Sequence, residues 1–287
     1  MKNTKYGIPS LRREFPSDEA CLEFIFDSLH CRHCSCGGKY KLIKGRKQFQ
    51  CSKCRFQIAP TSATIFHKSP TPLTLWFQAI LVFSNAKSGI SAKQLQRELE
   101  VTYKCAWRIL KLIREALKQG DDKLDGDVET DTAYFGGRGY SGKNNEDLSR
   151  VMKNKSVVMG AVKRGGKIRA KVVPDASSQA HGDFLRENIN PKNTRLMTDQ
   201  SNRYNLVATG YARYAVSHKH HEFARGDIHV NTIETFWSHV KRSIKGTHKV
   251  ISKKYLQTYL DGFVFHYNNR HSDKERFSAL LGALLRA

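Results

Sequence analysis

Three acidic residues stand where their carboxylates could hold divalent cations. Asp131 lies in a stretch typical of a strand, Asp199 ends another such stretch, and Glu234 lies in a helical segment, 229–246, whose other charges are basic. Hard cations such as Mg²⁺ and Mn²⁺ take oxygen ligands, and crowded carboxylates need cations to offset their repulsion. Two such ions about 3.5–4 Å apart activate a nucleophilic oxygen and stabilise the leaving oxygen of a phosphodiester. The three acids therefore predict a two-metal site for phosphodiester chemistry.

Each carboxylate has a competing interpretation. Glu129 lies two residues before Asp131, on the same face of the expected strand, and either could be the ligand. Asp199 could instead cap a following helix. Glu234 has no basic residue three or four positions away, which disfavours an ordinary ion pair along its own helix.

A lysine follows Glu234 on the same face of the helix. Lys241 lies about two helical turns later, so both side chains project from one side. It could hold a DNA phosphate beside the metal ions. Arg242 and Lys245 continue this basic segment, and we expect all three cations to contact DNA.

Five of the seven cysteines lie within residues 31–54. Pairs of cysteines separated by two residues are typical of a zinc ribbon, in which four ligands surround the ion tetrahedrally. We predict a structural Zn²⁺ held by two such pairs, Cys31 with Cys34 and Cys51 with Cys54. His33 and Cys36 have the same spacing as the first pair, so Cys36 is the leading substitute there.

Basic residues are in large surplus along the chain. Its 287 residues include 49 Lys and Arg against 26 Asp and Glu, a net charge of +23. Solubility rarely needs a charge beyond about 8, whereas neutralising phosphates releases condensed counterions, so this surplus indicates a nucleic-acid partner. We see no run of about 18 apolar residues and no signal-peptide core near the N-terminus. We therefore expect a cytoplasmic, nucleoid-associated protein with no membrane partner.

The segment 70–120 has the periodicity of helices. PLTLWFQAILVFSNAKSG predicts an apolar helix, and SAKQLQRELEVTYKCAWRILKLIREALKQG predicts a short helix, a turn at Val101 and Thr102, and a longer basic helix. Ser91 is a plausible N-cap. The pattern favours a helix-turn-helix, with an ordinary helical hairpin as the alternative. In the first case the second helix carries three cations toward DNA: Lys104, Arg108 and Lys111.

Strands and helices alternate from about Asp127 onward. DVETDTAYF, KSVVMGAVK and KIRAKVVP predict three strands, SSQAHGDFLRENI a helix, and TRLMTD and RYAVSH two more strands, with a weak helix at SNRYNLVATG between these two. Two helices follow, and residues 136–149 predict a polar loop. This is the element order of a ribonuclease H-like α/β domain. We expect three domains: a zinc ribbon at 1–62, a helix-turn-helix module at 63–122 and the α/β domain at 123–287.

With these residues placed, the chain resembles the zinc-ribbon-bearing DDE transposases of bacterial insertion sequences, the group akin to Merlin elements. The resemblance runs from about residue 24 to 270 and is carried by the ribbon, by VETDTAYFGGRG, by LMTDQSNRY and by HVNTIETFWSHVKRSIKGTHK. In the last motif an acid, an aromatic pair, a lysine and G-T-H follow in the family's order. The resemblance implies that Asp131, Asp199 and Glu234 are the catalytic triad and Lys241 the basic residue that follows it.

Two positions bear on this resemblance. The family commonly has an acid directly after its first catalytic aspartate, where this chain has Thr132. Some relatives have an asparagine as the third catalytic residue, which leaves Asn231 as an alternative to Glu234.

The resemblance implies a DNA transposase with Mg²⁺ or Mn²⁺ as catalytic ions. Such an enzyme cuts at terminal inverted repeats and joins the freed 3′-hydroxyls to target DNA. Because two ends must be joined, we expect a homodimer or a larger assembly on DNA. The alternatives are a non-catalytic zinc-ribbon regulator that binds DNA, and a ribonuclease H-like nuclease without strand transfer.

Overall fold

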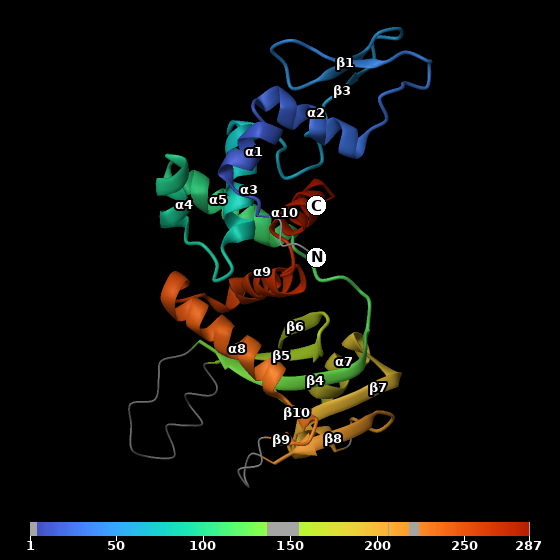
Figure 1. Ribbon diagram of the computed structural model, residues 1–287, viewed down its shortest axis with the longest axis vertical. Helices are drawn as coiled ribbons and strands as arrows, with labels where there is room; N and C mark the ends of the chain where they lie inside the picture. The colour runs from blue at the N-terminus through green and yellow to red at the C-terminus, as the bar shows by residue number, and fades with distance from the viewer. Residues whose placement is uncertain (1–4, 137–154, 206, 218–223, 287) are drawn as a thin grey trace. The chain divides into compact units, whose positions relative to one another are not determined.

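The computed structural model describes residues 5–136, 155–205, 207–217 and 224–286 (Figure 1). It divides into two compact units. One takes the chain up to Leu117 together with the segment from Asn269 onward, and the other runs from Lys118 to Asn268. Most of the predicted polar loop at 136–149 lies outside the described residues.

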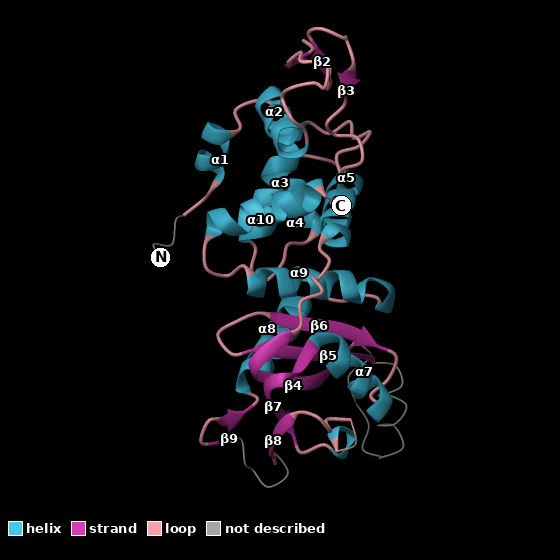
Figure 2. Cartoon of the chain, turned by 90° about the vertical axis from the view of Figure 1, so that its right-hand side faces the viewer, coloured by secondary structure: helices cyan, strands magenta, loops and turns pink. Residues whose placement is uncertain are grey.

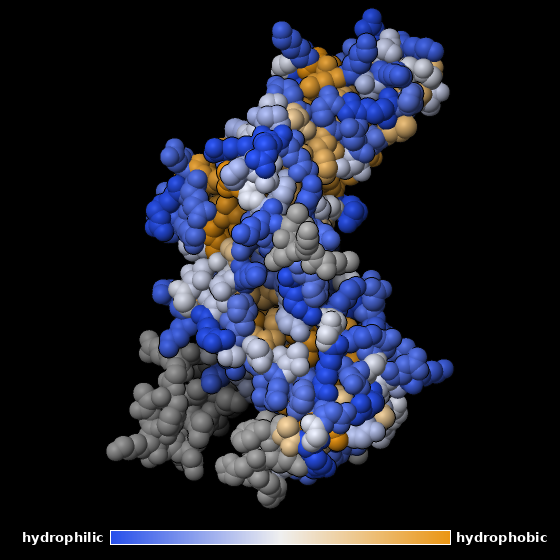
Figure 3. Space-filling view, in the orientation of Figure 1, coloured by the Kyte–Doolittle hydropathy of each residue, from blue (hydrophilic) through white to orange (hydrophobic). Residues whose placement is uncertain are grey.

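Polar side chains dominate the surface on view. Hydrophilic residues predominate on the face shown in Figure 3, with apolar side chains visible in patches between them. Within the described ranges, no helix has both the length and the apolar character needed to cross a membrane.

The second unit is built on a five-stranded mixed sheet with the strand order β6-β5-β4-β7-β8. β5 and β6 are antiparallel to their neighbours, whereas β7 and β8 run parallel to β4. Each strand overlaps a segment that the sequence predicts to be a strand, and the α/β class is confirmed. The strands are β4 (Leu124–Phe135), β5 (Ser156–Lys163), β6 (Ile168–Val173), β7 (Ile189–Asp199) and β8 (Ala212–Val216).

Helices cover both faces of this sheet (Figure 2). α8 (Asn231–Ser243) and α9 (Leu256–Asn268) share one core with Ala133 and Phe135 of β4. On the opposite face, α7 (Ser178–Asn188) shares a second core with other residues of β4, among them Leu124 and Val128. Because side chains alternate along a strand, Glu129 and Asp131 project to the α8 side.

A glycine in β5 allows α8 to approach the sheet. A Cβ atom on Gly160 would lie 2.4 Å from Cζ2 of Trp237 and 3.0 Å from Cδ1 of Ile233. Gly160 is also the antiparallel partner of Asp131. This contact therefore sets how closely α8 packs over the part of β4 that carries Asp131.

Replacing Gly160 by Ala should lower the free energy of unfolding by about 1–3 kcal/mol, because the indole of Trp237 must give way to the new methyl group. Urea denaturation measures the change. Gly120→Ala is the matched control, since a Cβ there has no atom within 4 Å. Wild-type stability in Gly160→Ala would contradict the close approach of α8.

The first unit is mainly helical. α3 (Leu73–Asn85) buries Trp76 and Phe77 completely, and α1 (Ile8–Glu14) and α2 (Asp18–Leu29) pack against it. The predicted apolar helix is thus confirmed as the centre of this unit.

The two helices predicted after α3 are α4 (Ala92–Leu99) and α5 (Tyr103–Ala116). Hydroxyl side chains cap both: Ser91 Oγ accepts the N–H of Gln94 at 3.1 Å, and Thr102 caps α5 in the same way. Between them Glu100 is in the left-handed region, with φ of 54°, which reverses the chain. The use of this pair as a helix-turn-helix stays a prediction.

The last helix, α10 (Asp273–Leu285), belongs to the first unit, where it packs against α3. Its buried Arg276 donates to the carbonyl of Ser84 at the end of α3 and pairs with Asp273 at 2.7 Å. The expected α/β domain extends to residue 287, whereas the compact unit ends at Asn268. The order of elements along the chain does not reveal that the apolar face of α10 finds its partner in α3.

The connection between β7 and β8 contains less helix than predicted. Its described residues form one 3₁₀ turn, Asn202–Tyr204. Ser201 Oγ accepts the N–H of Arg203 at 3.4 Å, and short polar side chains of this kind compete with the hydrogen bonds of a longer helix.

Candidate active site

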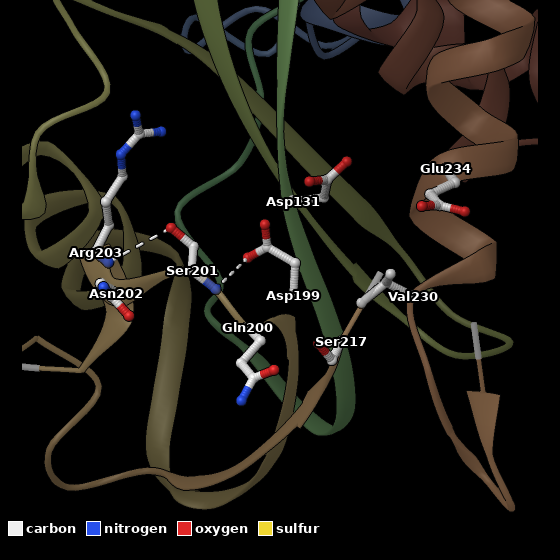
Figure 4. Close-up of a pocket in the computed structure, with 9 residues that line it drawn as sticks. All are labelled: Asp131, Asp199, Gln200, Ser201, Asn202, Arg203, Ser217, Val230 and Glu234. Carbon is white, nitrogen blue, oxygen red and sulfur yellow. Dashed lines mark hydrogen bonds between the residues drawn. The ribbon is translucent and has the colours of Figure 1, made fainter. Parts of the chain in front are cut away.

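The two predicted catalytic aspartates come from neighbouring parallel strands. The register of β4 and β7 places Glu129 beside Met197. Asp131 and Asp199 each lie two residues further on, so they project from adjacent strands on the same face of the sheet. Figure 4 shows both carboxylates lining one cleft.

Asp199 turns toward this cleft and does not serve as a helix cap. Its carboxylate accepts the N–H of Ser201 at 3.3 Å. The N-cap of the following 3₁₀ turn is Ser201 itself. The capping role that the sequence left open for Asp199 therefore falls to Ser201.

Glu234 reaches the cleft from the first turn of α8. In Figure 4 its carboxylate faces Asp131 and Asp199 across a cavity of about 450 Å³. Asn231, the alternative third residue, is not among the residues that line this cavity. The three acids predicted from the sequence thus converge from three separate elements.

Glu129 has a structural role at the start of α8. Its carboxylate is fully buried and accepts the N–H groups of Thr232 at 2.8 Å and Ile233 at 3.1 Å. Val230, the N-cap residue, has no side-chain oxygen to satisfy these donors. Arg164 also donates to Glu129, at 2.7 Å. These partners leave Asp131 as the candidate metal ligand of β4 and make Glu129 the anchor of the helix that carries Glu234.

Replacing Glu129 by Ala should lower the free energy of unfolding by about 3 kcal/mol, because it leaves buried donors and the Arg164 guanidinium without their carboxylate. The control is Asp125→Asn on the same strand. Asp125 pairs with Lys163 at 2.5 Å, but both side chains are about half exposed, and such surface pairs contribute at most about 1 kcal/mol. Urea denaturation compares the two variants, and equal losses would argue against a capping role for Glu129.

Asp131 lies within electrostatic reach of the other site residues. Burial is the main cause that raises the pKa of Asp131, to about 6. The N–H of Thr132 opposes this rise, the charges of Asp199 and Glu234 add to it, and the ammonium of Lys241 opposes it. A bound cation would offset the repulsion between these carboxylates and Asp131.

This raised pKa predicts how the stability of the metal-free protein depends on pH. Because the folded-state pKa of Asp131 exceeds the ordinary value of 3.8, the folded protein binds the proton more tightly. The contribution of Asp131 to stability therefore falls as pH rises from about 4 to about 6 and stays low above that. Each pH unit by which the pKa of Asp131 exceeds its ordinary value corresponds to about 1.4 kcal/mol of stability.

The variant Asp131→Asn should remove this loss. Without added Mg²⁺ or Mn²⁺, its melting temperature should exceed that of the wild type at pH 7 and converge with it near pH 4. Thermal unfolding of the two proteins from pH 4 to pH 8 measures the difference at pH 7 and the convergence near pH 4. A difference between the two proteins that stays constant over this range would contradict the raised pKa of Asp131.

Lys241 lies beyond Glu234 on α8. Its Nζ is 5.9 Å from the centroid of the Phe135 ring. Lys241 and Lys245 line a second cavity at the end of β4, and Arg242 is exposed but lines neither cavity. The structure therefore brings one of the three predicted cations, Lys241, close enough to act on Asp131.

Comparison with protein families decides the identity of this unit. Residues 123–268, half of the chain, match the family model described as the ISXO2-like transposase domain. The chain belongs to the ISXO2-like transposase family. The matched region coincides with the compact unit Lys118–Asn268 that carries the three acids. The family-level resemblance recognised in the sequence is thus confirmed.

A relative from an archaeon extends the likeness beyond this unit. The chain is 26% identical over 239 residues to the "Uncharacterized protein in transposable element ISH50" of Halobacterium salinarum. The alignment covers 79% of each chain. The transposase is thus similar to a protein of a transposable element over most of its length.

In its first unit the transposase carries a cluster of four cysteines beside a small antiparallel sheet, β1 (Tyr40–Leu42), β2 (Phe49–Cys51) and β3 (Gln57–Ile58). Their sulfur atoms all lie within 4.8 Å of one another, with separations of 3.7 Å for one pair and 3.4 Å for another. With Zn–S bonds of about 2.3 Å, a tetrahedral site has edges of about 3.8 Å, so the cluster could bind zinc. The four are Cys34, Cys36, Cys51 and Cys54.

The cluster contains Cys36 and not Cys31, which corrects the preferred pairing of Cys31 with Cys34. The reason is the tight turn at 34–38, which is closed by the N–H of Cys34 on the carbonyl of Gly38 at 2.8 Å. A Cβ on Gly38 would lie 2.5 Å from Sγ of Cys51, so the glycine makes room for the cluster. Spacing alone does not distinguish the two pairings.

The surface of the basic helix α5 combines exposed cations, a half-buried lysine and an exposed tryptophan. Lys104 and Arg108 are exposed, as the sequence predicts for DNA contacts. Lys111 is half-buried and pairs with Glu115 at 3.5 Å. Trp107 is 41% exposed on the same helix. Contact of this surface with DNA stays a prediction.

Proposed function

We propose that the chain cuts the ends of its insertion sequence and joins them to target DNA. The observation that carries this proposal is the convergence of Asp131, Asp199 and Glu234 on one cleft, within a unit that matches a transposase domain. The net charge of +23 fits a DNA substrate.

The donor set fits divalent cations. Three carboxylate side chains arrive from two strands and a helix, and the charges of the other two raise the pKa of Asp131. Held by Asp131, Asp199 and Glu234, a pair of Mg²⁺ or Mn²⁺ ions would supply activation of the attacking oxygen and stabilisation of the leaving oxygen.

The other residues of the site orient the DNA and the acids. Lys241, about two turns along α8 from Glu234, would bind a phosphate of the strand that enters the cleft. Glu129 fixes the start of α8, and the N–H of Ser201 orients Asp199. Because positioning and charge suffice for in-line attack, no covalent protein–DNA intermediate is required. The 3′-hydroxyl freed by the first cut is then the nucleophile that joins the end to target DNA.

The sheet and the first unit support the finer assignment. The sheet has the strand order β6-β5-β4-β7-β8. Along the chain, β4, β5 and β6 pair antiparallel, and β7 and β8 then run parallel to β4. This arrangement fits a ribonuclease H-like domain. We propose that the cysteine cluster holds structural Zn²⁺ and that it and α4–α5 read the terminal inverted repeats. Two such ends require a homodimer or a larger assembly.

A strand-transfer assay tests this function. The purified chain is incubated with Mn²⁺, a labelled duplex of the repeat that flanks its gene, and a supercoiled target plasmid. Joined products are the expected result. Nicking without joining would identify a nuclease, and binding without cutting would identify a regulator, so either outcome would replace the proposal.

A further inference from the structure

A second cavity, of about 510 Å³, lies further along β4 and α8, the strand and helix that carry Asp131 and Glu234. Phe135 follows Asp131 along β4, and Lys241 follows Glu234 along α8, so two of the three elements that carry the acids also line this cavity. We call it the lysine groove. Its far wall is the segment 249–253, which connects α8 and its π-helical extension, Ile244–His248, to α9.

The far wall contains a strained turn. Lys249 has φ of 63° and ψ of −63°, and the N–H of Val250 donates to the carbonyl of His248 at 2.7 Å. A γ-turn of this hand is rare and strained for a residue with a side chain. It leaves the side chain of Val250 83% exposed. Strain of this kind persists at sites where a ligand is held.

The lining combines positive charge with apolar walls. Four lysines surround the groove, and no acidic side chain is among the described residues that line it. Apolar side chains from Phe135, Val250 and Ile251 contribute to its walls. The lysines are Lys241, Lys245, Lys249 and Lys253.

A nucleotide has the matching chemistry, because its phosphate pairs with ammonium groups and the faces of its base are apolar. A duplex keeps its base faces stacked and hidden from such walls. A nucleotide that has left the stack offers both surfaces at once. Because β4 and α8 contribute to both the cleft and the groove, we assign this nucleotide to the strand being cut.

We propose that the lysine groove binds one unstacked nucleotide of the cut strand, next to the cleavage position. Its phosphates contact the lysines, and its base lies against Val250 and Ile251. This inference rests on the proposed function, since it takes the DNA strand in the catalytic cleft as its starting point.

Fluorescence of 2-aminopurine tests the inference, because this base brightens when it leaves the stack. Duplexes of the flanking repeat carry the probe at single positions on either side of the cleavage site and are titrated with the zinc-loaded full chain without added Mg²⁺ or Mn²⁺. The expected result is a rise of severalfold at one position. Val250→Asp should remove most of this rise, and its side chain is too exposed for the change to affect folding.

A charge-matched pair of variants tests the phosphate contacts. Lys249→Gln with Lys253→Gln should weaken binding of the repeat about tenfold or more. Lys123→Gln with Lys192→Gln removes the same charge from exposed positions of the same unit outside the groove and should weaken binding about twofold. Equal weakening by both pairs, or no brightening at any position, would overturn the inference.

The two proposals fail separately. End joining without brightening would leave the transposase function standing and remove the groove. Brightening at one position without any cutting would retain the groove and remove the catalytic assignment.

Discussion

Replacing Asp199 by Asn is expected to abolish DNA cutting while leaving DNA binding intact. The change keeps the size of the side chain but removes the negative charge that β7 delivers to the cleft. A neutral amide is a poor ligand for Mg²⁺ or Mn²⁺ among carboxylates. We expect the rate to fall by a factor of about 1000 or more, which corresponds to about 4 kcal/mol of transition-state stabilisation.

The measurement pairs a cleavage assay in Mn²⁺ with a mobility-shift assay on the same labelled repeat. Asp183→Asn is the control, because Asp183 is an exposed acid of α7 whose partner is Arg186 on the same helix, and it should cut at the wild-type rate. Cutting by Asp199→Asn at more than about a tenth of the wild-type rate would show that the metal assignment is wrong. Loss of DNA binding would point instead to misfolding, which its melting temperature identifies.

Replacing Cys36 by Ser should remove zinc from the protein and unfold the ribbon, whereas Cys31→Ser should do neither. Both are single substitutions of exposed cysteines in one short segment, but only Cys36 lies in the cluster. Structural zinc sites contribute about 10–16 kcal/mol of binding energy to folding. Loss of one zinc-binding thiolate should therefore destabilise the ribbon far more than the loss of a small side chain would.

Metal analysis of the purified proteins gives the zinc content of each variant. We expect about one zinc ion per chain in the wild type and in Cys31→Ser, and a small fraction of that in Cys36→Ser. Zinc loss from Cys31→Ser with retention in Cys36→Ser would restore the pairing predicted from spacing. Thermal unfolding of the variants provides an independent check on the ribbon.

Two of the three acids that line the cleft could be predicted because their sequence environments are local. Asp199 ends a predicted strand, and Glu234 is the only acid in a basic helical segment, so residue type and position point to both. The choice between Glu129 and Asp131 could not be made from the residues alone, since both project from the same face of one strand, and only the family resemblance favoured Asp131. It depends on the N–H groups of Thr232 and Ile233, which are distant in sequence.

Other features were hidden because they depend on local backbone geometry or on contacts between distant segments. The preference for Cys36 arises in a turn whose closing hydrogen bond is not visible in cysteine spacing. The strained γ-turn at Lys249 depends on backbone geometry that no residue type there indicates. The placement of α10 in the first unit depends on its contact with α3, far away along the chain.

That placement makes the unit from Lys118 to Asn268 an insertion within the first unit. The apolar face of α3 is completed only by α10, whose Phe277 contacts Tyr6 with ring centroids 5.2 Å apart. During synthesis, the helices of the first unit therefore have part of their core uncovered until the ribosome has made the residues after Asn268. A message cut short after Asn268 would yield a chain with all three acids but an unfinished N-terminal unit.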